Sequence, residues 1–146
     1  MMNLSYNHPL RRSLIKQLIF IDENRLDLVD MYLAATPIKD KDYNFFGRYI
    51  LEVEKFLREF DYSFSQKLET VFIGSEVTLY YVEENQLDQY TICFPEQSNP
   101  DSKCISLFSP IGRQIILKGI NELIRLTTPN GEANVIIKDI EFKQYC

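Results

Sequence analysis

The first third of the chain alternates apolar and polar residues with the period of an α-helix. Between Pro9 and about Ala35, apolar side chains recur every three or four residues. They form two adjacent rows: Leu14, Leu18, Ile21, Leu28 and Tyr32, and Ile15, Ile19, Leu26, Val29 and Leu33. This spacing predicts one amphipathic helix with a wide apolar face. Pro37 ends the pattern because its ring does not fit inside a helix.

A second helical pattern follows the short polar segment Lys39 to Asp42 and runs from about Phe45 to Phe60. Its apolar residues keep the spacing of a two-helix seam: Phe46, Ile50, Val53, Leu57 and Phe60. Two apolar helix faces joined by a short polar link predict an antiparallel, coiled-coil-like hairpin over residues 1–66. We expect most aromatic side chains here to pack between the helices, while the group from Tyr43 to Phe46 exceeds what a short turn can bury.

After Asp61 the apolar period changes to two, which is typical of β-strands. Strands are predicted near Val71–Tyr81, Gln89–Phe94, Cys104–Leu107, Leu123–Thr127 and Asn134–Phe142. Asn130-Gly131 predicts a hairpin between the last two, because glycine tolerates a positive φ.

One short helix is predicted among the strands. Ser109 can cap it, Pro110 suits its first position and Gly119 can end it. The predicted fold class is therefore α+β, with the helical hairpin followed by an antiparallel β-sheet domain, residues 67–146, that contains one short helix.

The net charge of −5 lies entirely in the second half of the chain. Residues 1–68 hold ten basic and ten acidic side chains, whereas residues 69–146 hold six basic and eleven acidic ones. A sequence-independent nucleic-acid binder needs a basic surface, and no basic cluster occurs. We therefore expect a protein partner and no direct nucleic-acid binding. No apolar stretch reaches the ~20 residues of a membrane span, so we expect a cytoplasmic protein.

The cysteines Cys93, Cys104 and Cys146 lie far apart, and His8 is the one histidine. This spacing favours neither a disulfide framework nor a zinc site. We interpret Cys93 and Cys104 as small core residues, and we expect neither a bound metal nor any other cofactor.

Four segments of the second half carry a family resemblance: Phe72-Ile73-Gly74-Ser75-Glu76-Val77-Thr78-Leu79, Tyr90-Thr91-Ile92, Ser109-Pro110-Ile111-Gly112-Arg113 and Thr128-Pro129-Asn130-Gly131-Glu132. In order and spacing they resemble the C-terminal, FKBP-like domain of the GreA/GreB bacterial transcription elongation factors. That family has a G-S-x-V-x-L strand, a Y-x-I strand, an S-P-[IL]-[GA]-R helix start and a T-P-x-G turn.

The resemblance implies a non-enzymatic factor that binds bacterial RNA polymerase. In Gre factors the C-terminal domain docks on the rim of the polymerase secondary channel, and the N-terminal coiled coil enters the channel. Ser109, Pro110, Ile111, Gly112 and Arg113 are the expected rim contacts. Arg113 falls in the first turn of the predicted helix, where the helix dipole opposes a cation, so a role toward the partner explains it better than helix stability does.

The turn between the two helices departs from the family pattern. Cleavage-stimulating members carry an acidic tip that resembles D-L-S-E-N-A-E-Y, whereas this turn has only Asp40 and Asp42, interleaved with lysines, followed by Tyr43. Carboxylates at the tip can help to hold a polymerase-bound Mg²⁺ and to orient water. A simply solvated turn is the alternative. The second helix is also short, and both features argue against stimulation of transcript cleavage.

Two other functions stay open at this point. The first is a non-cleaving Gre relative that occludes the channel, and the second is an FKBP-like peptidyl-prolyl isomerase, whose proline pocket needs aromatic lining that the strand pattern assigns to packing. The sequence also leaves open whether the chain forms a homodimer.

Overall fold

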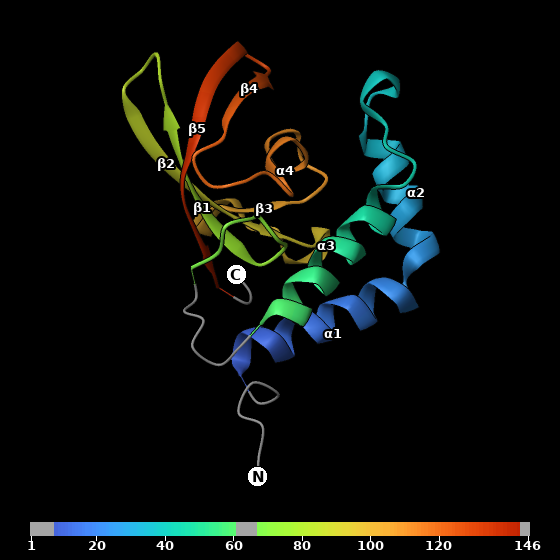
Figure 1. Cartoon of the computed structure of the whole chain (residues 1–146). Coiled ribbons are helices and arrows are strands. Elements are labelled where there is room, and N and C mark those ends of the chain that lie inside the picture. Colours follow the sequence, from blue (N-terminus) through green and yellow to red (C-terminus); the bar gives the residue numbers. More distant parts are fainter. Residues whose placement is uncertain (1–7, 61–66, 144–146) are drawn as a thin grey trace. The chain divides into compact units, whose positions relative to one another are not determined.

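Among the residues that the structure describes, the first part of the chain has three α-helices and a short 3₁₀ turn (Figure 1). The computed structural model describes residues 8–60 and 67–143, and the chain divides into two units, residues 1–64 and 65–146. The helical elements are α1 (Pro9–Glu23), α2 (Arg25–Ala35), the 3₁₀ turn η2 (Ile38–Asp40) and α3 (Phe45–Glu59).

The helices of the first unit form an antiparallel hairpin, as the sequence pattern predicts. Three contacts between its arms join Arg11 to the Leu57 carbonyl, the Tyr49 hydroxyl to Gln17, and the stacked rings of Tyr32 and Phe45. Residue numbers rise along one arm as they fall along the other, which is the signature of antiparallel arms. The buried residues come from both: Leu10, Leu14, Ile21, Leu28, Tyr32, Phe45, Phe46, Tyr49 and Val53.

The first arm breaks at Asn24, so the prediction of one continuous helix is wrong. Asn24 has φ −117° and ψ 22°, and its backbone and side-chain N–H groups donate to the Phe20 carbonyl at 3.0 and 2.9 Å. Asparagine competes in this way with the helical hydrogen-bond pattern. The apolar face is also narrower than predicted, because Ile19 is 53% exposed and Leu26 is 82% exposed.

The second unit is a five-stranded sheet with one short helix. The strand order is β3-β2-β1-β5-β4, and β1 forms antiparallel pairs with both β2 and β5. The elements are β1 (Ser75–Tyr81), β2 (Gln86–Cys93), η3 (Pro95–Gln97), η4 (Pro100–Ser102), β3 (Cys104–Ser106), α4 (Pro110–Ile115), β4 (Leu123–Thr128) and β5 (Gly131–Phe142).

Strand β3 runs parallel to β2, so the sheet is mixed and the expectation of a purely antiparallel sheet is wrong. The segment with η3 and η4 provides the crossover that a parallel pair requires. The predicted hairpin turn is confirmed: Gly131 has φ 118° and pairs with Thr128.

The sheet curls around α4, which lies on its inner face (Figure 1). Alternate residues of each strand point inward, and those of the central strands are fully buried, for example Val77, Leu79 and Ile137. Ile115 of α4 is buried as well.

Strands β2 and β5 each begin three residues earlier than predicted, and the start of β1 and the end of α4 differ as well. Strand β1 begins at Ser75, because the backbone of Val71 hydrogen-bonds to Leu117 and Lys118 outside the sheet. Helix α4 ends at Ile115 without a glycine cap. Gly119, the predicted cap, instead forms an isolated antiparallel β-bridge with Thr70.

Cys93 is buried and unpaired, and burial raises the pKa of its thiol to about 11. Cys104 is buried too, as predicted for a small core residue, but it is disulfide-bonded, which the spacing of the cysteines did not favour. Cys146 lies outside the described residues.

His8 caps α1: its Nδ1 accepts from the Leu10 N–H at 3.2 Å. Within the described ranges, no helix is long and apolar enough to cross a membrane.

Candidate protein-docking site

The segment Ser109 to Arg113 forms the first turn of α4 and is held by a double hydrogen bond of Ser109. The Ser109 hydroxyl accepts from the Gly112 N–H at 3.1 Å and donates to the Ser106 carbonyl at 2.7 Å. Proline follows at the first helical position, where its missing N–H costs nothing. The predicted cap is therefore confirmed, and it fixes this turn to the end of β3.

Gly112 permits the close approach of α4 to β3. A Cβ atom built on Gly112 would lie 2.2 Å from the Ser106 carbonyl oxygen, which is far inside van der Waals contact. Any side chain here must push the backbone of the helix away from the strand. The glycine thus has a structural reason to be in the motif.

Arg113 is half-buried, and its Nε is buried without a hydrogen-bond partner among the described residues. Arg113 lies in the first turn of α4 as expected, but because α4 has only six residues it also falls in the last turn. The dipole of so short a helix gives no argument for or against a cation there. Beside Arg113, Pro110 is exposed and Ile111 is half-buried, so an apolar surface adjoins the guanidinium.

Gln114 attaches the other side of α4 to the edge strand β4, a role that the sequence pattern does not reveal. Its Oε1 accepts from the Thr127 N–H at 2.8 Å, and its Nε2 donates to the Thr127 carbonyl at 2.9 Å. The same Nε2 donates to the Pro110 carbonyl at 2.8 Å. The side-chain amide therefore imitates a strand residue and fixes the turn from Ser109 to Arg113 from a second direction.

The turn between α2 and α3 holds the other predicted residues: Asp40, Asp42 and Tyr43. Asp42 is committed to contacts within the chain, because its carboxylate accepts from Arg48 Nε at 2.7 Å and from the Asn44 N–H at 3.0 Å. A second nitrogen of Arg48, Nη2, lies 2.5 Å from Oδ2 of the same carboxylate. Partial burial alone would raise the pKa of Asp42, but these hydrogen bonds outweigh it and lower the pKa.

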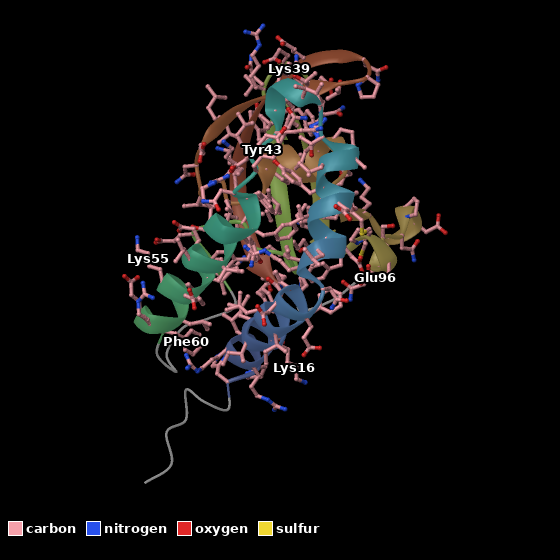
Figure 2. All side chains as sticks on the ribbon, turned by 90° about the vertical axis from the view of Figure 1, so that its right-hand side faces the viewer. Lys16, Lys39, Tyr43, Lys55, Phe60 and Glu96 are labelled. Atoms are coloured by element: carbon pink, nitrogen blue, oxygen red, sulfur yellow. The ribbon has the colours of Figure 1, made fainter. Side chains whose placement is uncertain are left out.

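Asp40 and Tyr43 remain on the surface of this turn. Asp40 is exposed, Tyr43 is 77% exposed and Ile38 is 84% exposed. Figure 2 shows Lys39 and Tyr43 on this part of the chain. Of the predicted aromatic group, Phe45 and Phe46 are buried. The exposed surface of the turn thus combines two apolar side chains with one carboxylate and a lysine.

The predicted residues form two separate groups: Ser109 to Arg113 belong to the second unit, and Asp40, Asp42 and Tyr43 belong to the first. In the described part of the chain, no three His, Cys, Asp or Glu side chains gather as a metal site would require. Both groups present exposed side chains, Pro110 in one and Asp40 and Tyr43 in the other. Each is suited to contact a protein surface.

A family model described as "Transcription elongation factor, GreA/GreB, C-term" matches residues 65–142. Curated relatives include a transcription elongation factor GreA of Buchnera aphidicola, 36% identical over 72 residues, which are 49% of this chain and 45% of the relative. A GreA of Helicobacter pylori is 32% identical over 76 residues, 52% of this chain and 46% of the relative. The chain spans about half the length of these relatives.

Solved structures with a similar fold include GreA factor homolog 1 (Gfh1) of Thermus thermophilus. It has 18% identity and a TM-score of 0.46 over 90% of this chain and 94% of that one. A GreA/GreB factor of Nitrosomonas europaea has 21% identity and a TM-score of 0.47 over 66% of this chain and 80% of that one.

Proposed function

Because the chain belongs to the GreA/GreB family of transcription elongation factors, we propose that it regulates transcription by binding bacterial RNA polymerase at the secondary channel. In this proposal the second unit docks on the channel rim, and the helical hairpin points inward. The chain is a binding factor and not itself an enzyme.

The guanidinium of Arg113 supports docking through the first turn of α4. Arg113 is half-buried at the surface of this turn, where an acceptor on a partner can form a charge-assisted hydrogen bond with the exposed part of its guanidinium. The turn is held from both sides, because Ser109 is hydrogen-bonded to β3 and Gln114 is hydrogen-bonded to β4. A preorganised turn loses little conformational entropy on binding. The exposed ring of Pro110 adds apolar contact area next to the charge.

The ion pair of Asp42 supports a regulator that does not stimulate transcript cleavage. A Mg²⁺ ion held at a polymerase active site draws on several oxygen ligands and on carboxylates in particular. Asp42 is already bound to Arg48, which leaves Asp40 as the exposed carboxylate of the turn. We propose that the turn occupies the channel mainly through Ile38 and Tyr43.

A single experiment on purified polymerase tests both parts. Wild-type protein and the variants Arg113→Glu and Asp40→Ala are titrated into backtracked elongation complexes, and both binding and transcript cleavage are measured. We expect binding by the wild type, a loss of about tenfold or more in Arg113→Glu, and no cleavage above the intrinsic rate.

The matched control is Arg125→Glu, the same charge reversal at an exposed arginine of β4. Thermal unfolding of each variant checks that the fold is intact. If the wild type does not bind polymerase, the proposed function is wrong. If the wild type stimulates cleavage and Asp40→Ala does not, docking stands, but the non-cleaving role is wrong.

A further inference from the structure

An exposed row of apolar side chains crosses four strands on the face of the sheet opposite α4. Leu87 of β2 pairs with Tyr80 of β1, Tyr80 pairs with Ile136 of β5, and Ile136 pairs with Leu123 of β4. Directly paired residues project to the same side of a sheet. These four residues therefore form one continuous row, called the outer row below.

The outer row is open to solvent in the part of the chain that the structure describes. Leu87 is 64% exposed, Leu123 is 62% exposed, and Tyr80 and Ile136 are half-buried between them. The neighbouring residues Leu79 and Ile137 point to the inner face and are fully buried. A contiguous exposed apolar patch with polar surroundings is typical of an interaction surface.

The charges beside the outer row have opposite signs on its two sides. Lys138 lies two residues after Ile136 along β5, and its Nζ lies 5.6 Å from the centre of the Tyr80 ring. Asn134 lies two residues before Ile136, and the Glu83 carboxylate accepts from its backbone N–H at 2.9 Å. Glu84 is exposed beside Glu83. Apart from charged residues that are ion-paired within the sheet domain, such as Arg125 and Asp139, one flank thus carries a lysine and the other two glutamates.

These flanking charges have no ion partner within the described residues. Lys138, Glu83 and Glu84 form no salt bridge there, whereas other charged residues of the sheet do, for example Arg125 with Glu132 and Lys143 with Glu76. A partner that presents a glutamate toward Lys138 and a lysine toward Glu83 would complement both flanks. A second copy of the same face has both groups.

We propose that the outer face of the sheet is the interface of a homodimer. A two-fold axis along the outer row places each apolar residue against its counterpart and brings Lys138 of each copy to Glu83 and Glu84 of the other. Because such a contact is isologous, the same pairing of a lysine with glutamates forms at two places in the dimer. A purely basic or purely acidic partner would repel one of the two flanks. The patch is small, so the dissociation constant is expected to lie in roughly the micromolar range.

This dimer leaves the proposed polymerase contact free, since α4 and its first turn lie on the inner face of the sheet (Figure 1). Dimerisation and polymerase binding are therefore independent. Failure of one does not bear on the other.

Charge-swapped variants of the full chain test the dimer by sedimentation equilibrium. Lys138→Glu places glutamates on both flanks, and the double variant Glu83→Lys/Glu84→Lys places lysines on both. We expect the wild type to dimerise and each variant alone to show a dissociation constant raised about tenfold or more. An equal mixture of the two variants pairs opposite charges at both contacts, so it should dimerise again. Lys55→Glu on α3 is the matched control and should behave like the wild type.

The mixture distinguishes a disrupted interface from a misfolded variant, because misfolded chains would not recover on mixing. A wild type that stays monomeric over the concentrations at which polymerase binding is measured would overturn the proposal. So would a dimer that all of these substitutions leave unchanged, since its interface would then lie elsewhere.

Discussion

At the residue scale, a few short-range contacts decide which of the candidate residues are available to a partner. Asp42 and Asp40 lie two positions apart, yet one is bound to Arg48 and the other is exposed. Ser109 and Gly112 are engaged in contacts within the chain. Pro110 is exposed, and Arg113 is half-buried with no hydrogen-bond partner for its Nε among the described residues. The motif therefore consists of residues that shape the turn and residues that the turn presents.

Gly112→Ala should destabilise the second unit. The new Cβ would lie 2.2 Å from the Ser106 carbonyl oxygen, and moving the backbone costs about 1–3 kcal/mol. Thermal unfolding measures the effect, with a decrease in Tm of several degrees expected. Gly119→Ala is the matched control, because its Cβ would meet the Glu69 carbonyl at an ordinary 3.6 Å. Equal effects of the two substitutions would contradict the close approach of α4 to β3.

Arg48→Gln should make the stability of the helical unit less dependent on pH at acidic values. The folded-state pKa of Asp42 is lowered, so its ion pair stabilises the fold above the unfolded pKa of about 3.9 and loses this effect as pH falls through the folded pKa. Both partners are at least a third exposed, so the contribution at pH 7 is below about 1 kcal/mol.

Urea unfolding of the wild type and of Arg48→Gln at pH 7 and at about pH 2 measures this difference. The two curves should converge at the lower pH, while Arg58→Gln, at an exposed arginine of the same helix, should match the wild type throughout. A difference that persists at low pH would show that Arg48 acts by packing.

At the element scale, α4 is placed by its two ends and by the strands on either side of it. Ser109 joins its start to β3, and Gln114 joins its last turn to β4. A helix of six residues has little stability of its own, so these attachments position the proposed docking turn. The bend at Asn24 acts in the same way in the hairpin, since it separates α1 from α2 and sets where the turn between α2 and α3 lies.

Gln114→Ala should loosen the edge strand locally. It removes the hydrogen bonds to both backbone groups of Thr127, worth about 1 kcal/mol in net stability. Amide hydrogen exchange at Thr127 should become faster, whereas exchange at residues paired between β1 and β5 should not change. Gln114→Glu keeps the acceptor for the Thr127 N–H and should protect that amide better than alanine does. Unchanged exchange at Thr127 in the alanine variant would contradict the attachment.

The sequence predicts the local elements well, because their causes are local. Ser109-Pro110 marks the start of α4, and Asn130-Gly131 marks the last hairpin, as observed. The parallel pairing of β3 was missed because it depends on how the segment with η3 and η4 returns to the sheet. Gln114 and Arg48 were missed for a related reason: their partners are set by the folded chain, and neither residue type indicates such a role by itself.

At the scale of the whole molecule, the chain combines a short helical hairpin with a sheet domain that has two different faces. Helix α3, the second arm of the hairpin, has 15 residues and extends about 22 Å at 1.5 Å per residue. The inner side of the sheet carries α4 with the proposed polymerase contact, and the outer face carries the proposed dimer contact. The chain divides into two units, and in the proposed complex each unit contributes its own contacts to the polymerase.

Site-specific photo-cross-linking to purified RNA polymerase tests whether the chain docks on the polymerase through α4. A photoreactive amino acid replaces Pro110, which is exposed at the start of α4, or Arg125 on the outer face as the control. Docking through α4 predicts a cross-link to the polymerase from position 110 and little or none from position 125. No cross-link from position 110, in a complex that demonstrably forms, would show that the polymerase contacts another surface and would contradict the account.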